Sequence, residues 1–167
     1  MNRPATTPLV TQDPMNAEAF DKPRIVKPAI PGYENTTTLD LLTAMILGEA
    51  ESEDLNSMRA IASVVPNRIQ ADSRDFGDDW RKVLLNPGAF YGLSDLTARD
   101  RIRNAYAEGS ESLQNARRAA FEALSGKLRT DPKIIGATFF ASDPGLHKDK
   151  KFLGRVGKFY FYQGRAK

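Results

Sequence analysis

The sequence contains no cysteine and only one histidine, and these shortages exclude several classes of site. Without cysteine there is no disulfide scaffold, no thiolate zinc site and no cysteine nucleophile. Any Ser-His-Asp triad would have to use His147, which lies in a polar stretch that predicts an exposed loop. A metal site would need mostly carboxylate ligands. We therefore assign no metal and no cofactor to the chain.

Long apolar runs are also missing from the sequence. No segment approaches the ~20 consecutive apolar residues that a membrane-spanning helix requires, so we expect no membrane span. The N-terminus, Met1–Pro8, lacks the apolar core of a signal peptide. We therefore expect synthesis in a cytoplasm, with no export signal in the chain itself.

Proline is concentrated at the N-terminus. Six of the ten prolines lie in the first 31 residues, at positions 4, 8, 14, 23, 28 and 31. Proline removes a backbone donor and disfavours helix in the preceding residue, so residues 1–38 are predicted to form an extended, proline-rich arm without a core. Such an arm becomes ordered only through contacts, either with its own domain or with other chains, and we expect it to dock onto partner chains.

Apolar residues recur at helical spacing through most of the remaining chain. The pattern begins after the N-cap candidates Thr36–Thr38, and it predicts helices near residues 39–49, 55–70, 78–85, 97–107 and 112–124. Pro66 lies inside the second of these helices and should bend it. Gly126 is placed to end the last one.

Two short aromatic segments follow the helices. Ala137–Ala141 and Lys158–Tyr162 predict strands that pair antiparallel across a polar connection. Helices followed by a small sheet indicate the α+β class. The predicted fold is one mainly helical domain over residues 39–167, with a small antiparallel sheet near the C-terminus.

One carboxylate stands out from the helical pattern. Glu49 shares a helix face with the apolar residues Leu42, Met45 and Ile46. A carboxyl group against such a face is partly desolvated, which raises its pKa and lets it act as a general acid near neutral pH. The alternative, which periodicity alone favours, is that Glu49 marks the end of the helix and turns out to water.

Several segments resemble, in the same order along the chain, the motifs of the SleB-type cell wall hydrolases. They are Gly48-Glu49-Ala50 with Glu53 after it, Ala60–Val65 with Asn67-Arg68-Ile69, Asn86–Phe90, Ala119–Gly126, Asp131-Pro132 with Gly136–Phe140, and Val156-Gly157 with Phe161-Tyr162. The resemblance extends over most of residues 39–167.

This resemblance implies a lysozyme-like fold that cleaves the glycan strand of bacterial peptidoglycan, between N-acetylmuramic acid and N-acetylglucosamine. It also implies a lytic transglycosylase mechanism, in which one essential glutamate serves as acid and base, and the role falls on Glu49. Two roles are open for Glu53, four residues later: support of Glu49, or capping of a loop.

The aromatic strands supply candidates for glycan binding, because sugar rings pack on aromatic faces and hydroxyl groups fix their orientation. With Glu53, the substrate-binding candidates are Thr138, Phe140, Tyr160, Tyr162 and Phe90. The alternative for these residues is a place in the core of the sheet, and for the phenylalanines this alternative is the first choice.

Several positions depart from the family pattern. Glu51-Ser52 replaces an Arg-Gly pair, Pro66 replaces a leucine, Lys158-Phe159 replaces an Asn-His pair, and a tryptophan expected after the first strand is missing. These changes fall where the substrate would be gripped. The rival hypothesis is therefore a non-catalytic structural component of a virion or its tail, built on a degenerate hydrolase fold.

The C-terminal segment is strongly basic. From Lys148 to Lys167, seven lysines and arginines accompany one acidic residue, Asp149. Such a segment suits an anionic cell wall, whereas its alternation with strand residues argues against nucleic acid. With the missing export signal and the N-terminal arm, this predicts a phage-encoded protein of the virion, or one that passes from host cytoplasm to periplasm or cell wall. The arm would then dock onto other virion proteins.

Overall fold

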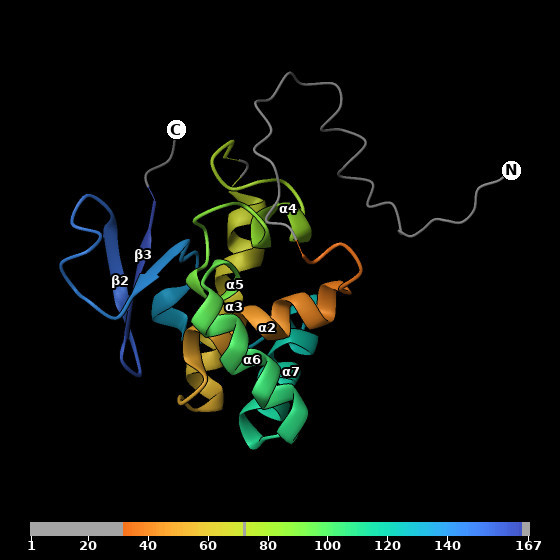
Figure 1. Cartoon of the computed structure of the whole chain (residues 1–167). Coiled ribbons are helices and arrows are strands. Elements are labelled where there is room, and N and C mark those ends of the chain that lie inside the picture. The colour runs from red at the N-terminus through yellow and green to blue at the C-terminus, as the bar shows by residue number, and fades with distance from the viewer. Residues whose placement is uncertain (1–31, 72, 165–167) are drawn as a thin grey trace, which may run out of the picture.

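The computed structural model describes residues 32–71 and 73–164, which form a helical body with a small sheet beside it (Figure 1). The helices are α2 (Thr38–Ala50), α3 (Leu55–Gln70), α4 (Trp80–Leu84), α5 (Tyr91–Ser94), α6 (Leu96–Glu108), α7 (Glu111–Leu124) and the 3-10 helix η2 (Pro132–Ile134). The strands are β1 (Phe139–Ala141), β2 (Lys151–Val156) and β3 (Phe159–Gln163). The predicted α+β class, with its sheet near the C-terminus, is confirmed.

Helix α2 lies at the centre of the helical body. It begins at the N-cap Thr37, whose side chain accepts a hydrogen bond from the amide of Asp40 at 3.1 Å. All residues from Leu41 to Gly48 are buried, and so is Ala50. The sequence predicted one apolar face, but neighbouring elements enclose this helix on every side, as expected for a helix that is apolar all round.

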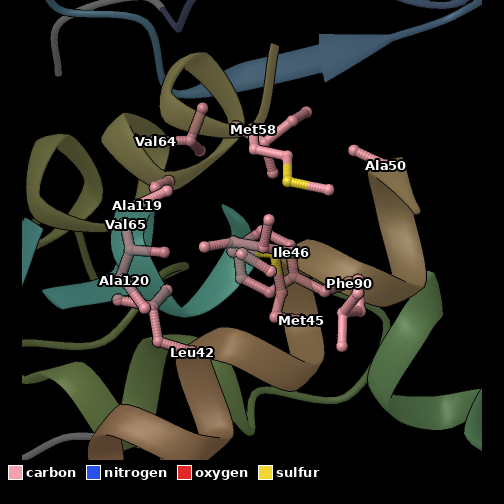
Figure 2. Close-up of a cluster of buried hydrophobic side chains, with 14 of the residues drawn as sticks. Leu42, Met45, Ile46, Ala50, Met58, Val64, Val65, Phe90, Ala119 and Ala120 are labelled. Atoms are coloured by element: carbon pink, nitrogen blue, oxygen red, sulfur yellow. The ribbon is translucent and has the colours of Figure 1, made fainter. Parts of the chain in front are cut away.

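The hydrophobic core surrounds α2. In Figure 2, Met45 and Ile46 of α2 point into a cluster that Val65 of α3, Ala120 of α7 and the buried ring of Phe90 complete. Close packing of this kind leaves few alternative positions for the helix. The last turn of α2 is therefore held firmly where it meets the sheet side of the molecule.

Helix α3 continues through Pro66, and its last turn is tied to the strand β1 segment. Asn67 donates from Nδ2 to the carbonyl oxygen of Ala137 at 2.8 Å. Arg68 donates from Nε to the carbonyl oxygen of Thr138, also at 2.8 Å. These two bonds fix the entry of β1 against the end of α3.

The sheet has the strand order β1-β3-β2 and is antiparallel. The predicted pairing of the two aromatic strands is confirmed, with Phe140 opposite Phe161. The stretch between them was expected to be a polar connection, and this was wrong: it contains β2, which pairs with β3 across a bulge between Phe152 and Gly154. Lysine, arginine and glycine in β2 obscure its strand pattern in the sequence.

Part of the predicted arm belongs to the domain. The side chain of Arg81 donates hydrogen bonds to the carbonyl oxygens of Thr36 at 2.6 Å and Tyr33 at 2.8 Å, so the segment before α2 packs on its own chain. Residues 1–31 of the predicted arm lie outside the described residues. In the two described stretches, no helix is both long and apolar enough to cross a bilayer.

Candidate active site

Glu49 lies in the last turn of α2 and is the one residue between Leu41 and Ala50 that is not fully buried. It lines two adjoining hollows, with cavity volumes of about 1410 and 370 Å³. Tyr91, Phe140 and Leu146 also line both hollows, so the two meet at these four residues. Together they form a groove with Glu49 near its middle.

The position of Glu49 depends on a contact between two glycines. Gly48 of α2 and Gly92 of α5 approach so closely that a β-carbon on Gly92 would lie 2.6 Å from the Cα atom of Gly48. Real β-carbons do not approach other atoms that closely, so both positions require glycine. This contact brings the backbone amide of Gly92 to within 2.9 Å of Glu49 Oε2, to which it donates a hydrogen bond.

The pKa of Glu49 is raised above its ordinary value, and burial is the main cause. The amides of Gly92 and Tyr91 and the positive charges of Arg68 and Arg101 act in the opposite direction, but they do not outweigh desolvation. The carboxyl group therefore holds its proton to a higher pH than an exposed glutamate, which is the property that a general acid requires.

Arg68 is the second buried ionisable group of the groove. Its exposed fraction is only 6%, and burial lowers its pKa to about 10. The guanidinium lies over the rings of Phe76, Phe90 and Phe139, at 4.9, 4.8 and 5.4 Å from their centroids. It lines the larger hollow with Glu49, and the charge of Glu49 acts on its pKa. Sequence reasoning noticed Arg68 only as part of a motif.

The structure brings two of the predicted substrate-binding residues to the groove. Phe140 lines both hollows, and Thr138 lines the larger one. Phe90 lines neither hollow: it is buried behind Phe140, with the two rings stacked at 6.4 Å. Phe90 therefore supports the groove from the core, in line with the alternative given for the phenylalanines.

The remaining predicted residues lie away from the hollows. Tyr160 and Tyr162 alternate with Phe161 along β3 and line neither hollow; both rings pack beside Phe152 of β2 instead. The hydroxyl of Tyr162 donates to the carbonyl oxygen of Pro144 at 3.0 Å. Strand alternation explains this, because neighbouring residues of a strand face opposite sides of the sheet.

Glu53 does not share a helix with Glu49, because α2 ends at Ala50. It lines neither hollow, and its carboxylate lies 3.6 Å from Nζ of Lys158. Glu53 therefore connects the loop after α2 to the turn before β3.

The loop between β1 and β2 forms a wall of the groove that the sequence did not predict. His147 was expected to be exposed, but it is half-buried between the rings of Phe139 and Tyr162, at 5.2 and 5.4 Å. Leu146 beside it is 64% exposed, and Tyr91 on α5 is 58% exposed. Over residues 32–71 and 73–164, no group of acidic and histidine side chains has an arrangement that could hold a metal ion.

Two solved structures with a similar architecture are both catalytic domains of SleB proteins. The catalytic domain of the germination-specific lytic transglycosylase SleB from Bacillus anthracis aligns at a TM-score of 0.53 and 22% identity, over 80% of this chain and 100% of that one. The catalytic domain of SleB from Bacillus cereus aligns at 0.51 and 21%, over 81% and 95%. The fold is therefore that of a SleB catalytic domain.

The sequence itself matches the model of the cell wall hydrolase family over residues 52–162, which is more than half of the chain. The chain belongs to the cell wall hydrolase family. This membership supports peptidoglycan degradation as the general function. The matched range begins just after Glu49, so the match itself does not include this residue. No curated protein sequence gives a significant match.

The glycine contact yields a prediction about stability. Alanine normally replaces a helical glycine with a gain of about 1 kcal/mol. For Gly48→Ala we expect instead a loss of about 1–3 kcal/mol in the free energy of unfolding, because the new methyl group meets the backbone of Gly92. Urea unfolding measures this loss. Gly145→Ala is the control, since its β-carbon would lie no closer than 3.4 Å to any atom; equal stability of the two variants would contradict the prediction.

The raised pKa of Glu49 yields a second prediction. A carboxyl group whose pKa is higher in the folded than in the unfolded chain makes folding less favourable as pH rises between the two values. Glu49→Gln removes this cost but keeps an acceptor for the amide of Gly92. We expect the variant to melt at a higher temperature than the wild type at pH 7–8. The difference should shrink as pH falls below the ordinary pKa of glutamate, and a difference that is constant with pH would contradict the prediction.

Proposed function

We propose that this protein cleaves the bond between N-acetylmuramic acid and N-acetylglucosamine in peptidoglycan, with Glu49 as the catalytic acid and base. The observation that carries the proposal is the carboxyl group of Glu49, held partly desolvated where the two hollows of the groove meet. Family membership and the SleB-like fold support the substrate class.

The proposed reaction has two proton transfers. Protonated Glu49 donates its proton to the oxygen that joins the two sugars, and the bond from this oxygen to the anomeric carbon of the muramic acid breaks. The ionised carboxylate then accepts the proton of the 6-hydroxyl group on the same muramic acid, and that oxygen bonds to the anomeric carbon. The product is a 1,6-anhydro sugar, no water is consumed, and Glu49 returns to its protonated form.

The surroundings of Glu49 suit both steps. Desolvation favours the protonated form that the first step uses. In the second step the carboxylate must persist long enough to act as a base, and the amide of Gly92 with the charge of Arg68 favours this ionised form. One residue can therefore serve as acid and base in turn.

A single carboxylate also fits the charges around Glu49. Two-carboxylate glycosidases place their acidic groups about 5–9.5 Å apart on opposite sides of the scissile bond. A second carboxylate at that distance would raise the pKa of Glu49 further, whereas the charged side chains that act on it are Arg68 and Arg101. Among the described residues this favours the transglycosylase route over hydrolysis by a pair of acids.

The proposal is tested by digesting purified peptidoglycan and analysing the fragments by mass spectrometry. We expect anhydromuropeptides from the wild type and at least a hundredfold slower release from Glu49→Gln, since this variant has no proton to donate. Glu53→Gln is the matched control, because Glu53 lies in the next loop and outside the groove. It should keep most of the activity.

Other outcomes assign other functions. Fragments with reducing ends would indicate hydrolysis of the glycan, and the protein would then be a muramidase and not a lytic transglycosylase. Equal activity of Glu49→Gln and the wild type would overturn the role of Glu49. No cleavage by any form would favour the rival hypothesis of a structural component, which the departures at Glu51-Ser52 and Lys158-Phe159 support. The phage context and the docking of residues 1–38 remain predictions from the sequence.

A further inference from the structure

Arg68 carries a buried positive charge without a matching negative one. Burying an isolated charge is costly, and proteins usually offset this cost with an ion pair. Arg59, for example, is partly buried and pairs with Glu122 at 2.8 Å. Within the described part of the chain, no acidic side chain lies at ion-pair distance from Arg68.

The aromatic rings around Arg68 explain how its charge is tolerated. Phe76, Phe90 and Phe139 face the guanidinium, and each such contact offsets part of the desolvation. The rings supply no hydrogen-bond acceptor in the plane of the group. Nε is satisfied by the carbonyl oxygen of Thr138. The terminal nitrogens have no acceptor in the described part of the chain, and Arg68 lines the groove.

Glu49 does not neutralise this charge. The two side chains line the same hollow and influence each other electrostatically, but they form no ion pair. Burial also favours the neutral form of Glu49. The groove therefore has a fixed positive charge beside the proposed acid.

We propose that Arg68 binds a carboxylate of the glycan substrate next to the bond on which Glu49 acts. The proposal deepens the proposed function and rests on it for the identity of the substrate. A guanidinium matches a carboxylate geometrically, because two parallel N–H groups can donate to its two oxygens. The rings hold the group in place before the ligand arrives, so little conformational freedom is lost on binding.

Peptidoglycan offers this carboxylate from two sources. One is the lactyl group of muramic acid, which is a free carboxylate only where the stem peptide has been removed. The other is the stem peptide itself, through its acidic side chain or its C-terminus. Both present the same planar anion, so the experiment must separate them.

Arg68 also has a structural role, through the bond from Nε to Thr138, and the test must distinguish the two roles. A purely structural Arg68 would affect charged and uncharged ligands equally. A carboxylate-binding Arg68 would affect only the charged ligand. The informative quantity is therefore the ratio of two affinities, which loss of stability alone does not change.

The test measures equilibrium binding by calorimetry, with the full chain carrying Glu49→Gln so that cleavage is slow compared with the measurement. The ligands are soluble disaccharide-peptide oligomers of peptidoglycan, either native or with their carboxylates converted to methylamides. We expect the native oligomers to bind about tenfold to a hundredfold more tightly, which is the range for hydrogen bonds to a charged group. Oligomers stripped of stem peptides, with the lactyl carboxylate free or converted to the methylamide, identify the source.

Two further variants assign the effect to Arg68. Adding Arg68→Gln to the same chain should remove the preference for the native ligand, and Arg68→Lys, which keeps the charge but not the paired donors, should retain part of it. Lys150→Gln is the matched control. Lys150 lines the same hollow, but its charge is already paired with Asp149 at 2.7 Å.

The outcomes separate this proposal from the proposed function. Equal affinity for native and amidated oligomers, or a loss of preference in Lys150→Gln equal to that in Arg68→Gln, would overturn the proposal while leaving the cleavage reaction intact. If instead the preference for native oligomers depends on Arg68 but the wild type releases no fragments from peptidoglycan, the carboxylate site is supported and the catalytic role of Glu49 is contradicted. Should Arg68→Gln fail to fold, Arg68→Lys still decides the result.

Discussion

The approach of the Gly48 and Gly92 backbones is the constraint on which the geometry of the groove depends. Because neither residue has a side chain, α5 comes close enough for its amide to reach Glu49, and Tyr91 reaches the edge of the groove. Helix α2 cannot move aside to relieve this contact, since it is enclosed by core on every side. The packing of α2 against α5 thus fixes the position of the carboxyl group in the groove.

This arrangement lowers the stability of the folded protein. A half-buried carboxyl group and a buried guanidinium each cost free energy that apolar residues in their places would not. The fold offsets these costs locally, with an amide for Glu49 and with a carbonyl oxygen and three aromatic rings for Arg68. The offset for Glu49 is incomplete, because its pKa remains raised. Retaining both groups is therefore more readily explained by function than by folding.

The sequence predicted the features that depend on local spacing. Helix α3 has the predicted bounds, and the antiparallel pairing of the aromatic strands is correct, because long periodic or strongly aromatic segments can be recognised from the sequence alone.

Other features have no such pattern. Helix α5 is too short for any period to be visible, and charged residues hide β2. Glu49 stood out because it interrupts an apolar helix, but periodicity alone favoured a helix end turned to water, and only the resemblance to the SleB-type hydrolases made it the candidate acid. Which face of β3 meets the groove could not be predicted, since alternation separates Tyr160 from Phe161 without saying which side is covered. Arg68 was missed because Phe76 and Phe139, which bury it, come from other segments.

The separation of Glu49 and Arg68 is itself informative. An ion pair between them would neutralise both charges, and the two side chains line one hollow and influence each other electrostatically. Pairing would also lower the pKa of Glu49 and occupy the free donors of Arg68, so neither could act on a ligand. The hydrogen bond from Gly92 holds one side chain, and the bond to Thr138 holds the other. These two backbone contacts fix the carboxyl group and the guanidinium in separate positions. The two roles proposed for the groove, proton donation by Glu49 and carboxylate binding by Arg68, both depend on this separation.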